Sequence, residues 1–249
     1  MASTSEQTFG NRLEHAHTLQ TALKKLTGFA PDNPALTDVN LGDFLDTIED
    51  ANALVAGTGQ ALAGARSDRR LAYFGSAKDG VAGLITLAGR VRDNVGSMAG
   101  GKKSASYKQV QKLVQKISNY RPPRKAVSSS PPDTNAQKKE ISRSEASYGS
   151  LLQAGRDLAA AVAKITGYNP AALDLKPAAL AAAMEPLAGH NKTVTEALID
   201  AGKATANRAK LYDADLTGLQ SQFQQAKAAV ASQFGRRSPE YKSISGIKY

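Results

Sequence analysis

Hydrophobic residues recur every three or four positions over long stretches of this chain, which is the pattern of amphipathic helices that bury one face. The first stretch predicts a helix over residues 6–27. Its apolar positions are Phe9, Leu13, Ala16, Leu19, Leu23 and Leu26. Gly28 suits the left-handed residue that ends a helix, Phe29 can fold back on the last turn, and Pro31 prevents continuation.

Three further helices follow in the first half of the chain, over residues 41–73, 78–98 and 104–117. The seam of the first is Leu41, Leu45, Ile48, Asn52, Val55 and Leu62. The seam of the second is Val81, Leu84, Ala88, Val91, Val95 and Met98. The short last helix places Tyr107, Val110, Val114 and Ile117 on one face.

The second half of the chain repeats this pattern in the same order. The stop sequence at 27–31 returns as Thr-Gly-Tyr-Asn-Pro at 166–170. At the same offset, Asn52 corresponds to Asn191, Arg69 to Arg208 and Tyr73 to Tyr212. The matching seams are Leu180, Met184, Leu187, Asn191, Val194 and Leu198, and then Leu216, Leu219, Phe223, Ala226, Val230 and Phe234. A Gly-basic-basic-Ser-x-x-Tyr-Lys motif closes both copies, at 101–108 and 235–242.

The repeat predicts an all-α, internally duplicated helical bundle, with two three-helix units related by an approximate twofold axis. The expected division is a first repeat at 1–118, a basic linker rich in Pro and Ser at 119–140, and a second repeat at 141–249. One difference is expected within the copies. Pro186 lies where the first copy has Thr47, so the helix there should kink or restart, because the proline ring clashes with a preceding carbonyl.

Composition narrows the class of protein. The chain has no cysteine, so thiolate metal sites and disulfides are excluded. No apolar run is long enough to cross a bilayer, and the amino terminus lacks the basic and apolar regions of a signal peptide. We therefore expect a cytoplasmic protein without membrane contact. The formal net charge is +10, and most of the excess lies in residues 99–146.

The basic residues are the candidate anion-binding site, and nucleic acid or another polyanion is the partner they would fit. They are Lys102, Lys103, Lys108, Lys112, Lys116, Arg121, Arg124, Lys125, Arg236 and Arg237. Ser104 and Ser238 are expected to cap helices beside the basic pairs. The alternatives are that these charges only complement helix ends, form a solvated linker, or face an acidic surface such as 43–50 of a neighbouring subunit.

Two other groups of polar residues could carry a specific role. Asn52 and Asn191 fall on apolar seams, where a buried amide fixes register, and the two would meet if the copies pack about a twofold axis. Arg69 with Tyr73, and Arg208 with Tyr212, are pairs one turn apart that indicate helix-end braces. Glu14 and His17 have the spacing of a di-metal bundle ligand pair, but a second such pair is missing, so neither a metal nor another cofactor is expected.

The closing sequence Gly-x-x-Ser-Pro-Glu-Tyr-Lys at 235–242, together with the stop at 166–170, resembles uncharacterised bacterial all-helical proteins. The resemblance covers most of each half and implies a bacterial cytoplasmic setting, without an activity, substrate or site. The sequence thus favours a non-enzymatic structural or self-assembling protein that is homo-oligomeric. The alternative is an anion or nucleic-acid binder acting through residues 102–125, and the third hypothesis is an enzyme whose site has no sequence motif.

Overall fold

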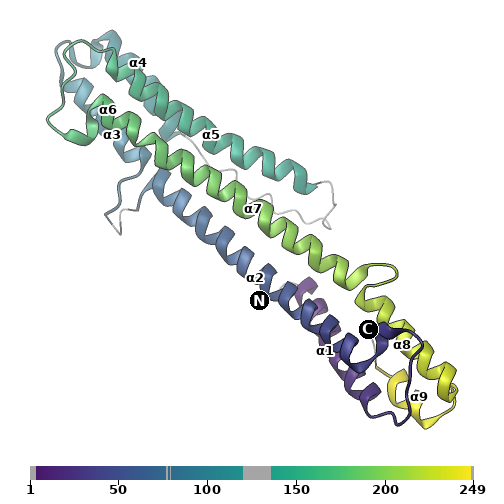
Figure 1. Cartoon of the computed structure of the whole chain (residues 1–249). Coiled ribbons are helices and arrows are strands. Elements are labelled where there is room, and N and C mark those ends of the chain that lie inside the picture. The colour runs from purple at the N-terminus through teal and green to yellow at the C-terminus, as the bar shows by residue number, and fades with distance from the viewer. Residues whose placement is uncertain (1–3, 77, 79, 120–135, 248–249) are drawn as a thin grey trace. The chain divides into compact units, whose positions relative to one another are not determined.

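A computed structural model describes residues 4–76, 78, 80–119 and 136–247, and the side chains of 4–8 and 136–147 are outside that description. The described residues are almost entirely helical, which confirms the all-α class (Figure 1). Their α-helices are α1 (Thr4–Lys24), α2 (Asp38–Phe74), α3 (Leu84–Ser97), α4 (Ala105–Ser118), α5 (Ala136–Ala163), α6 (Pro177–Ala182), α7 (Met184–Asp213), α8 (Leu219–Phe234) and α9 (Pro239–Ser245). Short 3₁₀ helices are η1 (Pro34–Leu36), η2 (Gly101–Lys103) and η3 (Leu173–Leu175).

The chain forms two compact units, and each combines residues from both halves of the sequence. Unit 1 comprises residues 1–60 and 199–249, and unit 2 comprises residues 61–198. Both long helices, α2 and α7, contribute residues to both units. These units are groups of residues that pack together, so they differ from the ranges 1–118, 119–140 and 141–249, which were predicted from the repeated sequence pattern. Those ranges stay a prediction.

The core of unit 1 joins the amino-terminal helix to the carboxy-terminal helices. Helix α1 contacts α8 and α9, and η1 contacts α8. The buried side chains are Ala16, Leu19, Leu23, Leu36, Leu41, Leu45, Ile48, Tyr212, Leu219, Phe223, Ala226, Val230 and Ile244. The seams predicted for the first half therefore pack against those predicted for the second half.

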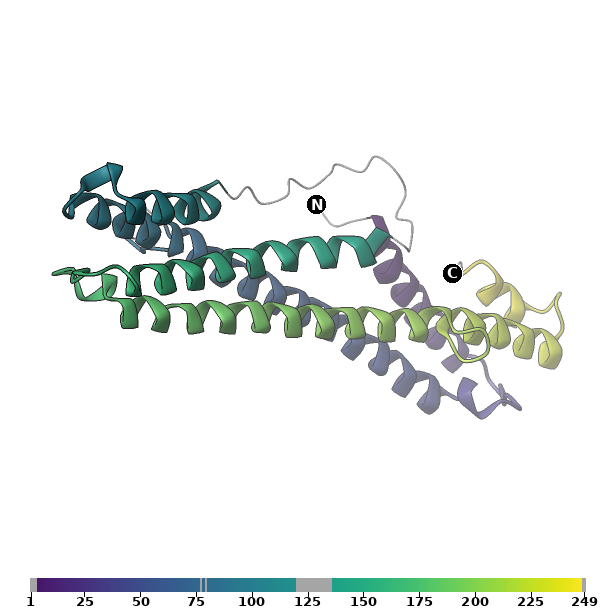
Figure 2. The same ribbon diagram turned by 90° about the horizontal axis from the view of Figure 1, so that it is seen from above.

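The core of unit 2 is likewise built from helices of both halves of the sequence. Helix α5 contacts α3, α4 and α6, and Figures 1 and 2 show α4 and α5 side by side. Its large buried side chains include Tyr73, Leu84, Val91, Val95, Tyr107, Val110, Val114, Ile117, Leu151, Leu158, Val162, Leu180, Met184 and Leu187. In the part of the chain that the structure describes, no helix has both the length and the apolar character needed to cross a bilayer.

The predicted caps and left-handed glycines are confirmed, but α1 and α5 already end at Lys24 and Ala163, a turn before those glycines. Gly28 and Gly167 adopt left-handed backbone angles, with φ of 80° and 78°. Ser104 Oγ accepts a hydrogen bond from the Tyr107 amide at 3.1 Å, and Ser238 Oγ accepts one from the Tyr241 amide at 3.0 Å. Each serine thus satisfies an N–H group that the first helical turn leaves open.

The expected restart at Pro186 is also observed. Helix α6 ends at Ala182 and α7 begins at Met184, so Pro186 lies in the first turn of the new helix, where its missing N–H costs no hydrogen bond. In the first half, α2 continues without interruption past Thr47.

The predicted helix over 78–98 begins too early. Helix α3 starts at Leu84, after Gly75 and Gly80, both with positive φ, and after a backbone bridge between Ser76 and Val81. Gly83 then approaches the preceding helix so closely that an added Cβ would lie 2.3 Å from the Gly75 nitrogen. This turn breaks the helical register, which the hydrophobic spacing alone does not reveal.

Two seam positions predicted to be buried are therefore exposed. Val81 is 41% exposed and Leu216, its counterpart in the second half, is 79% exposed. Both precede the helix they were assigned to. Helix α5 begins at Ala136, within the range 119–140 that is predicted as the linker. The remainder of that linker, residues 120–135, lies outside the described residues.

Candidate functional site

The basic segment of the first half is displayed on one side of a firmly packed helix. The amphipathic pattern of α4 buries Tyr107, Val110, Val114 and Ile117 against α3 and α5. Lys108, Lys112 and Lys116 are exposed. Because residues four apart share a helix face, these three ammonium groups form a single row, here called the lysine row.

The structure places the other predicted anion-binding residues in three locations. Lys102 and Lys103 are exposed in η2, directly before α4 in unit 2. Arg236 and Arg237 are exposed before α9 in unit 1. Arg121, Arg124 and Lys125 lie outside the described residues. Unit 2 thus brings five of the predicted cations together, and the arginine pair belongs to the other unit.

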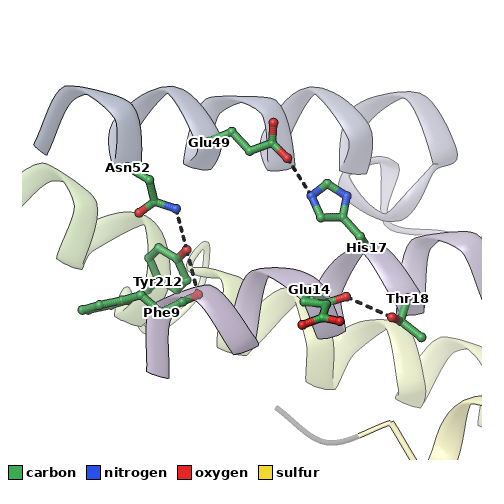
Figure 3. A network of polar contacts seen from close by, with 7 residues as sticks. All are labelled: Phe9, Glu14, His17, Thr18, Glu49, Asn52 and Tyr212. Carbon is green, nitrogen blue, oxygen red and sulfur yellow. Dashed lines mark hydrogen bonds and ion pairs between the residues drawn. The ribbon is translucent and has the colours of Figure 1, made fainter. Parts of the chain in front are cut away.

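Asn52 and Asn191 do not pair with each other; each donates a hydrogen bond to a tyrosine from the other half of the sequence. In unit 1, Asn52 Nδ2 donates to Tyr212 Oη at 3.1 Å, and Tyr212 Oη donates to the Phe9 carbonyl at 3.2 Å (Figure 3). The hydroxyl therefore accepts one hydrogen bond and donates another, which lets a fully buried tyrosine keep its polar end satisfied.

Unit 2 contains the same arrangement at the corresponding positions. Asn191 Nδ2 donates to Tyr73 Oη at 2.9 Å, and Tyr73 Oη donates to the Tyr148 carbonyl at 3.3 Å. We call each set of asparagine, tyrosine and aromatic residue a brace: Asn52, Tyr212 and Phe9 in unit 1, and Asn191, Tyr73 and Tyr148 in unit 2. Each asparagine thus holds a buried tyrosine hydroxyl, and the structural role expected from the seam positions stays a prediction.

An arginine completes each brace. The Arg69 guanidinium carbon lies 3.9 Å from the Tyr148 ring centroid, and that of Arg208 lies 4.4 Å from the Phe9 ring centroid. Arg69 is only 4% exposed. The tyrosine rings meet the same aromatic partners edge to face, at 5.0 Å for Tyr73–Tyr148 and 4.6 Å for Phe9–Tyr212. Cation–π and edge-to-face contacts are both favourable.

Sequence reasoning identified the arginine and tyrosine of each brace but missed Phe9 and Tyr148. The sequence did contain the signal for them, since Phe9 and Tyr148 are separated by the same number of residues as the other repeated pairs.

The contacts of the braces also explain the shifted pKa of the tyrosine hydroxyls. Burial raises the pKa of Tyr73 and Tyr212 above the ordinary value of 10.0, and the hydrogen bonds from Asn191 and Asn52 partly oppose the shift. Both hydroxyls therefore keep their protons at neutral pH and can donate to their carbonyl partners.

The histidine-containing segment of α1 forms a separate surface contact. A ring nitrogen of His17 lies 2.9 Å from Glu49 Oε1, and Thr18 Oγ1 donates to the Glu14 carbonyl at 2.9 Å (Figure 3). Among the described residues, no group of His, Cys, Asp and Glu is arranged to hold a metal ion. A hollow of about 500 Å³ near this segment is lined by residues that include Glu14, Lys25 and Ser243.

Comparison with family models, with curated proteins and with solved structures finds no match for this chain.

Proposed function

We propose that this protein is a non-enzymatic helical scaffold that associates with copies of itself, in the bacterial cytoplasm. One observation carries the proposal: the middle of α2, residues 51–65, has no charged side chain and is largely exposed. Within the described run from Glu49 to Asp68, no side chain is fully buried. Exposed helix faces are ordinarily rich in charged residues, so this one is suited to contact another protein surface.

The side chains of this segment favour close helix packing. Its exposed positions are Ala53, Leu54, Ala56, Gly57, Gly59, Gln60, Ala61, Ala63 and Gly64. Leu54 is 54% exposed, and the three glycines have no atom within 4 Å of an added Cβ. Glycine in an exposed helix costs about 1 kcal/mol relative to alanine. Small residues on a second helix could approach this face closely enough to offset that cost.

The residues that recur in both halves support a structural role. They are helix stops, serine caps and the two braces, and each holds helices together. We also propose that the chain is an internally duplicated bundle, whose two three-helix repeats are related by an approximate twofold axis. The matching hydrogen bonds and stacked arginines of the braces support this origin, since equal contacts at equal offsets are difficult to acquire independently.

Light scattering and sedimentation across a range of concentrations test the self-association. We expect a mass above that of one chain and an interface of at least about 1,000 Å². Leu54→Lys should weaken association, because it places a charge in the contact. Leu216→Lys is the matched control, since it also adds one charge at an exposed leucine. A strictly monomeric wild type at high concentration would refute the proposal.

The second candidate function is non-specific polyanion binding through residues 102–125. The observation that favours it is the lysine row, whose three ammonium groups are exposed and form no ion pair with the residues that the structure describes. Phosphate neutralisation would release counterions, so binding should fall steeply with salt. A gel shift at low and moderate salt tests it, with Lys108/Lys112/Lys116→Glu as the variant and Lys176/Lys203/Lys210→Glu as the charge-matched control. No shift at low salt would exclude this function.

A further inference from the structure

The lysine row is a rigid feature of unit 2 that forms no ion pair within the described part of the chain. The apolar side of α4 is held against α3 and α5, so the opposite side cannot turn inward. At 1.5 Å per residue, the row from Lys108 to Lys116 spans about 12 Å. A fixed row of like charges repels itself, and a complementary row on another surface would relieve that repulsion.

A matching acidic row lies on α2 in unit 1. Asp43, Asp46 and Asp50 are exposed and separated by steps of three and four, so they share one helix face. Leu41, Leu45 and Ile48 anchor this part of α2 in the core. The acidic row spans about 10 Å. Among the described residues it forms no ion pair, whereas the neighbouring Glu49 contacts His17.

We infer that the lysine row of one copy docks on the acidic row of a second copy. This inference rests on the proposed self-association and names the surfaces that direct it. Each row has three charges, similar length and a rigid helical support, so the two can lie alongside each other with their charges matched. Because the two surfaces differ, the contact is heterologous, and it produces either a ring or an open chain of copies.

The chemistry of the row favours an acidic protein surface over nucleic acid. Proteins that bind single strands combine cations with exposed aromatic rings, but Tyr107, the aromatic residue of α4, is buried. Helix α4 has no arginine, the residue with a planar fork that binds phosphate in two places. Lysines act as point charges that suit carboxylates equally well. The charged rows would set orientation and association rate, while the uncharged segment 51–65 contributes apolar contact.

Charge reversal of each row, followed by its rescue, tests the docking. The first variant is Lys108/Lys112/Lys116→Glu and the second is Asp43/Asp46/Asp50→Lys. Sedimentation should show each to self-associate at least about tenfold more weakly than wild type, because like rows then face each other. An equimolar mixture of the two, and a variant carrying both reversals, should recover association, since opposite charges again meet. The wild-type affinity should fall as salt rises.

Circular dichroism verifies that each variant is folded, and Lys176/Lys203/Lys210→Glu controls for the change in net charge of the lysine-row variant. If the wild type associates but both reversals leave the affinity unchanged, the docking is refuted and the self-association stands. If the wild type is monomeric, both are refuted. If the reversals weaken association but the combined variant fails to recover it, the pairing of these rows is refuted. A lysine-dependent gel shift without rescue would assign the row to polyanions instead.

Discussion

Unit 1 and unit 2 hold their helices with the same brace, but they differ in the residues around it. In each unit, an asparagine donates to a buried tyrosine, the tyrosine donates to a helix carbonyl, and an arginine lies over an aromatic ring. Next to the unit 1 brace, Arg12 forms an ion pair with Asp213 at 2.5 Å. At the corresponding positions of unit 2 the residues are Leu151 and Phe74, which belong to its apolar core.

A similar difference occurs near the end of α8 in unit 1 and of α3 in unit 2. In unit 1, the Gln233 side chain donates to the Gly28 carbonyl at 2.5 Å and accepts from the Ala30 amide at 3.1 Å. In unit 2, Met98 packs against the core at the matching place. Unit 1 thus uses polar contacts where unit 2 uses apolar ones. The polar atoms of the braces need specific partners, while the positions around them accept either kind of complementary pair.

The largest expected effect is loss of a brace tyrosine. Tyr73→Ala and Tyr212→Ala each remove a fully buried ring, and each should lower the free energy of unfolding by about 3–5 kcal/mol. Urea unfolding followed by circular dichroism measures this. Tyr241→Ala, at a half-buried position, should cost clearly less. A large cost in one unit and a negligible cost in the other would show that the two braces are not equivalent.

Removing only the hydroxyl is a milder change. Tyr73→Phe removes the acceptor of the Asn191 side-chain amide, and Tyr212→Phe removes that of Asn52. Each change should lower the free energy of unfolding by about 1–3 kcal/mol. A double-mutant cycle with Asn191→Leu or Asn52→Leu isolates the hydrogen bond. The pair should cost less than the sum of the single changes. Strict additivity in both units would contradict the role assigned to the asparagines.

The brace tyrosines also predict a loss of stability in alkali. Burial raises the pKa of both hydroxyls above the ordinary value of 10.0. The folded state therefore keeps its protons at a pH where the unfolded chain releases them, so this contribution is complete below about pH 10 and is lost as pH rises through the raised pKa. Urea unfolding at increasing pH should show the decline. The double variant Tyr73→Phe/Tyr212→Phe should show a smaller decline, and an unchanged slope would contradict the assignment.

Local chemistry explains which features could be predicted from the sequence. The stops at Gly28 and Gly167 and the caps at Ser104 and Ser238 depend on a few neighbouring residues, so their patterns are readable. From the first residue of α3 and of α8 onward, the helical spacing of apolar residues correctly predicted the buried seam. The predicted start of α3 was wrong because Val81 fits the helical spacing although it lies before the helix. The feature that sets the start is the close approach of Gly83 to Gly75, which is a contact made only in the folded chain.

The pairing of helices could not be predicted for a related reason. Asn52 and Asn191 were expected to meet each other, but each bonds to a tyrosine instead, because periodicity does not say which helix faces which. The observed exchange, in which α1 packs with α8 and α9 while α5 packs with α3 and α4, depends on contacts between distant segments. The lysine row was predictable because its spacing on one helix sufficed. Its pairing with the acidic row on α2 stays a proposal, because spacing along one helix does not indicate which surface that helix meets.

A smaller effect is expected from replacing the polar loop contact of unit 1 by its unit 2 equivalent. Gln233→Met removes the two hydrogen bonds to the loop that follows α1. Both hydrogen bonds are exposed to solvent, so the change should cost about 1 kcal/mol. The preceding residue of α8, Ser232, is also exposed, so Ser232→Met is the matched control and should change stability little. Urea unfolding compares the two variants with wild type. A similar cost for both would show that the effect is not specific to the loop contact.

The smallest net effect is expected from exchanging the whole pair beside the unit 1 brace. Asp213→Phe alone leaves the Arg12 guanidinium, whose side chain is 14% exposed, without its carboxylate. Because Asp213 is 51% exposed, this should cost about 1–2 kcal/mol, less than the loss of a fully buried pair. Arg12→Leu alone loses the contacts of the guanidinium with the Phe9 and Tyr212 rings and should cost about 1 kcal/mol. The double variant Arg12→Leu/Asp213→Phe recreates the apolar pair of unit 2, so its cost should be below that of either single variant. Urea unfolding of the three proteins measures the coupling. Costs that simply add would mean that the surroundings of the two braces are not interchangeable, and that each unit is specialised beyond its shared brace.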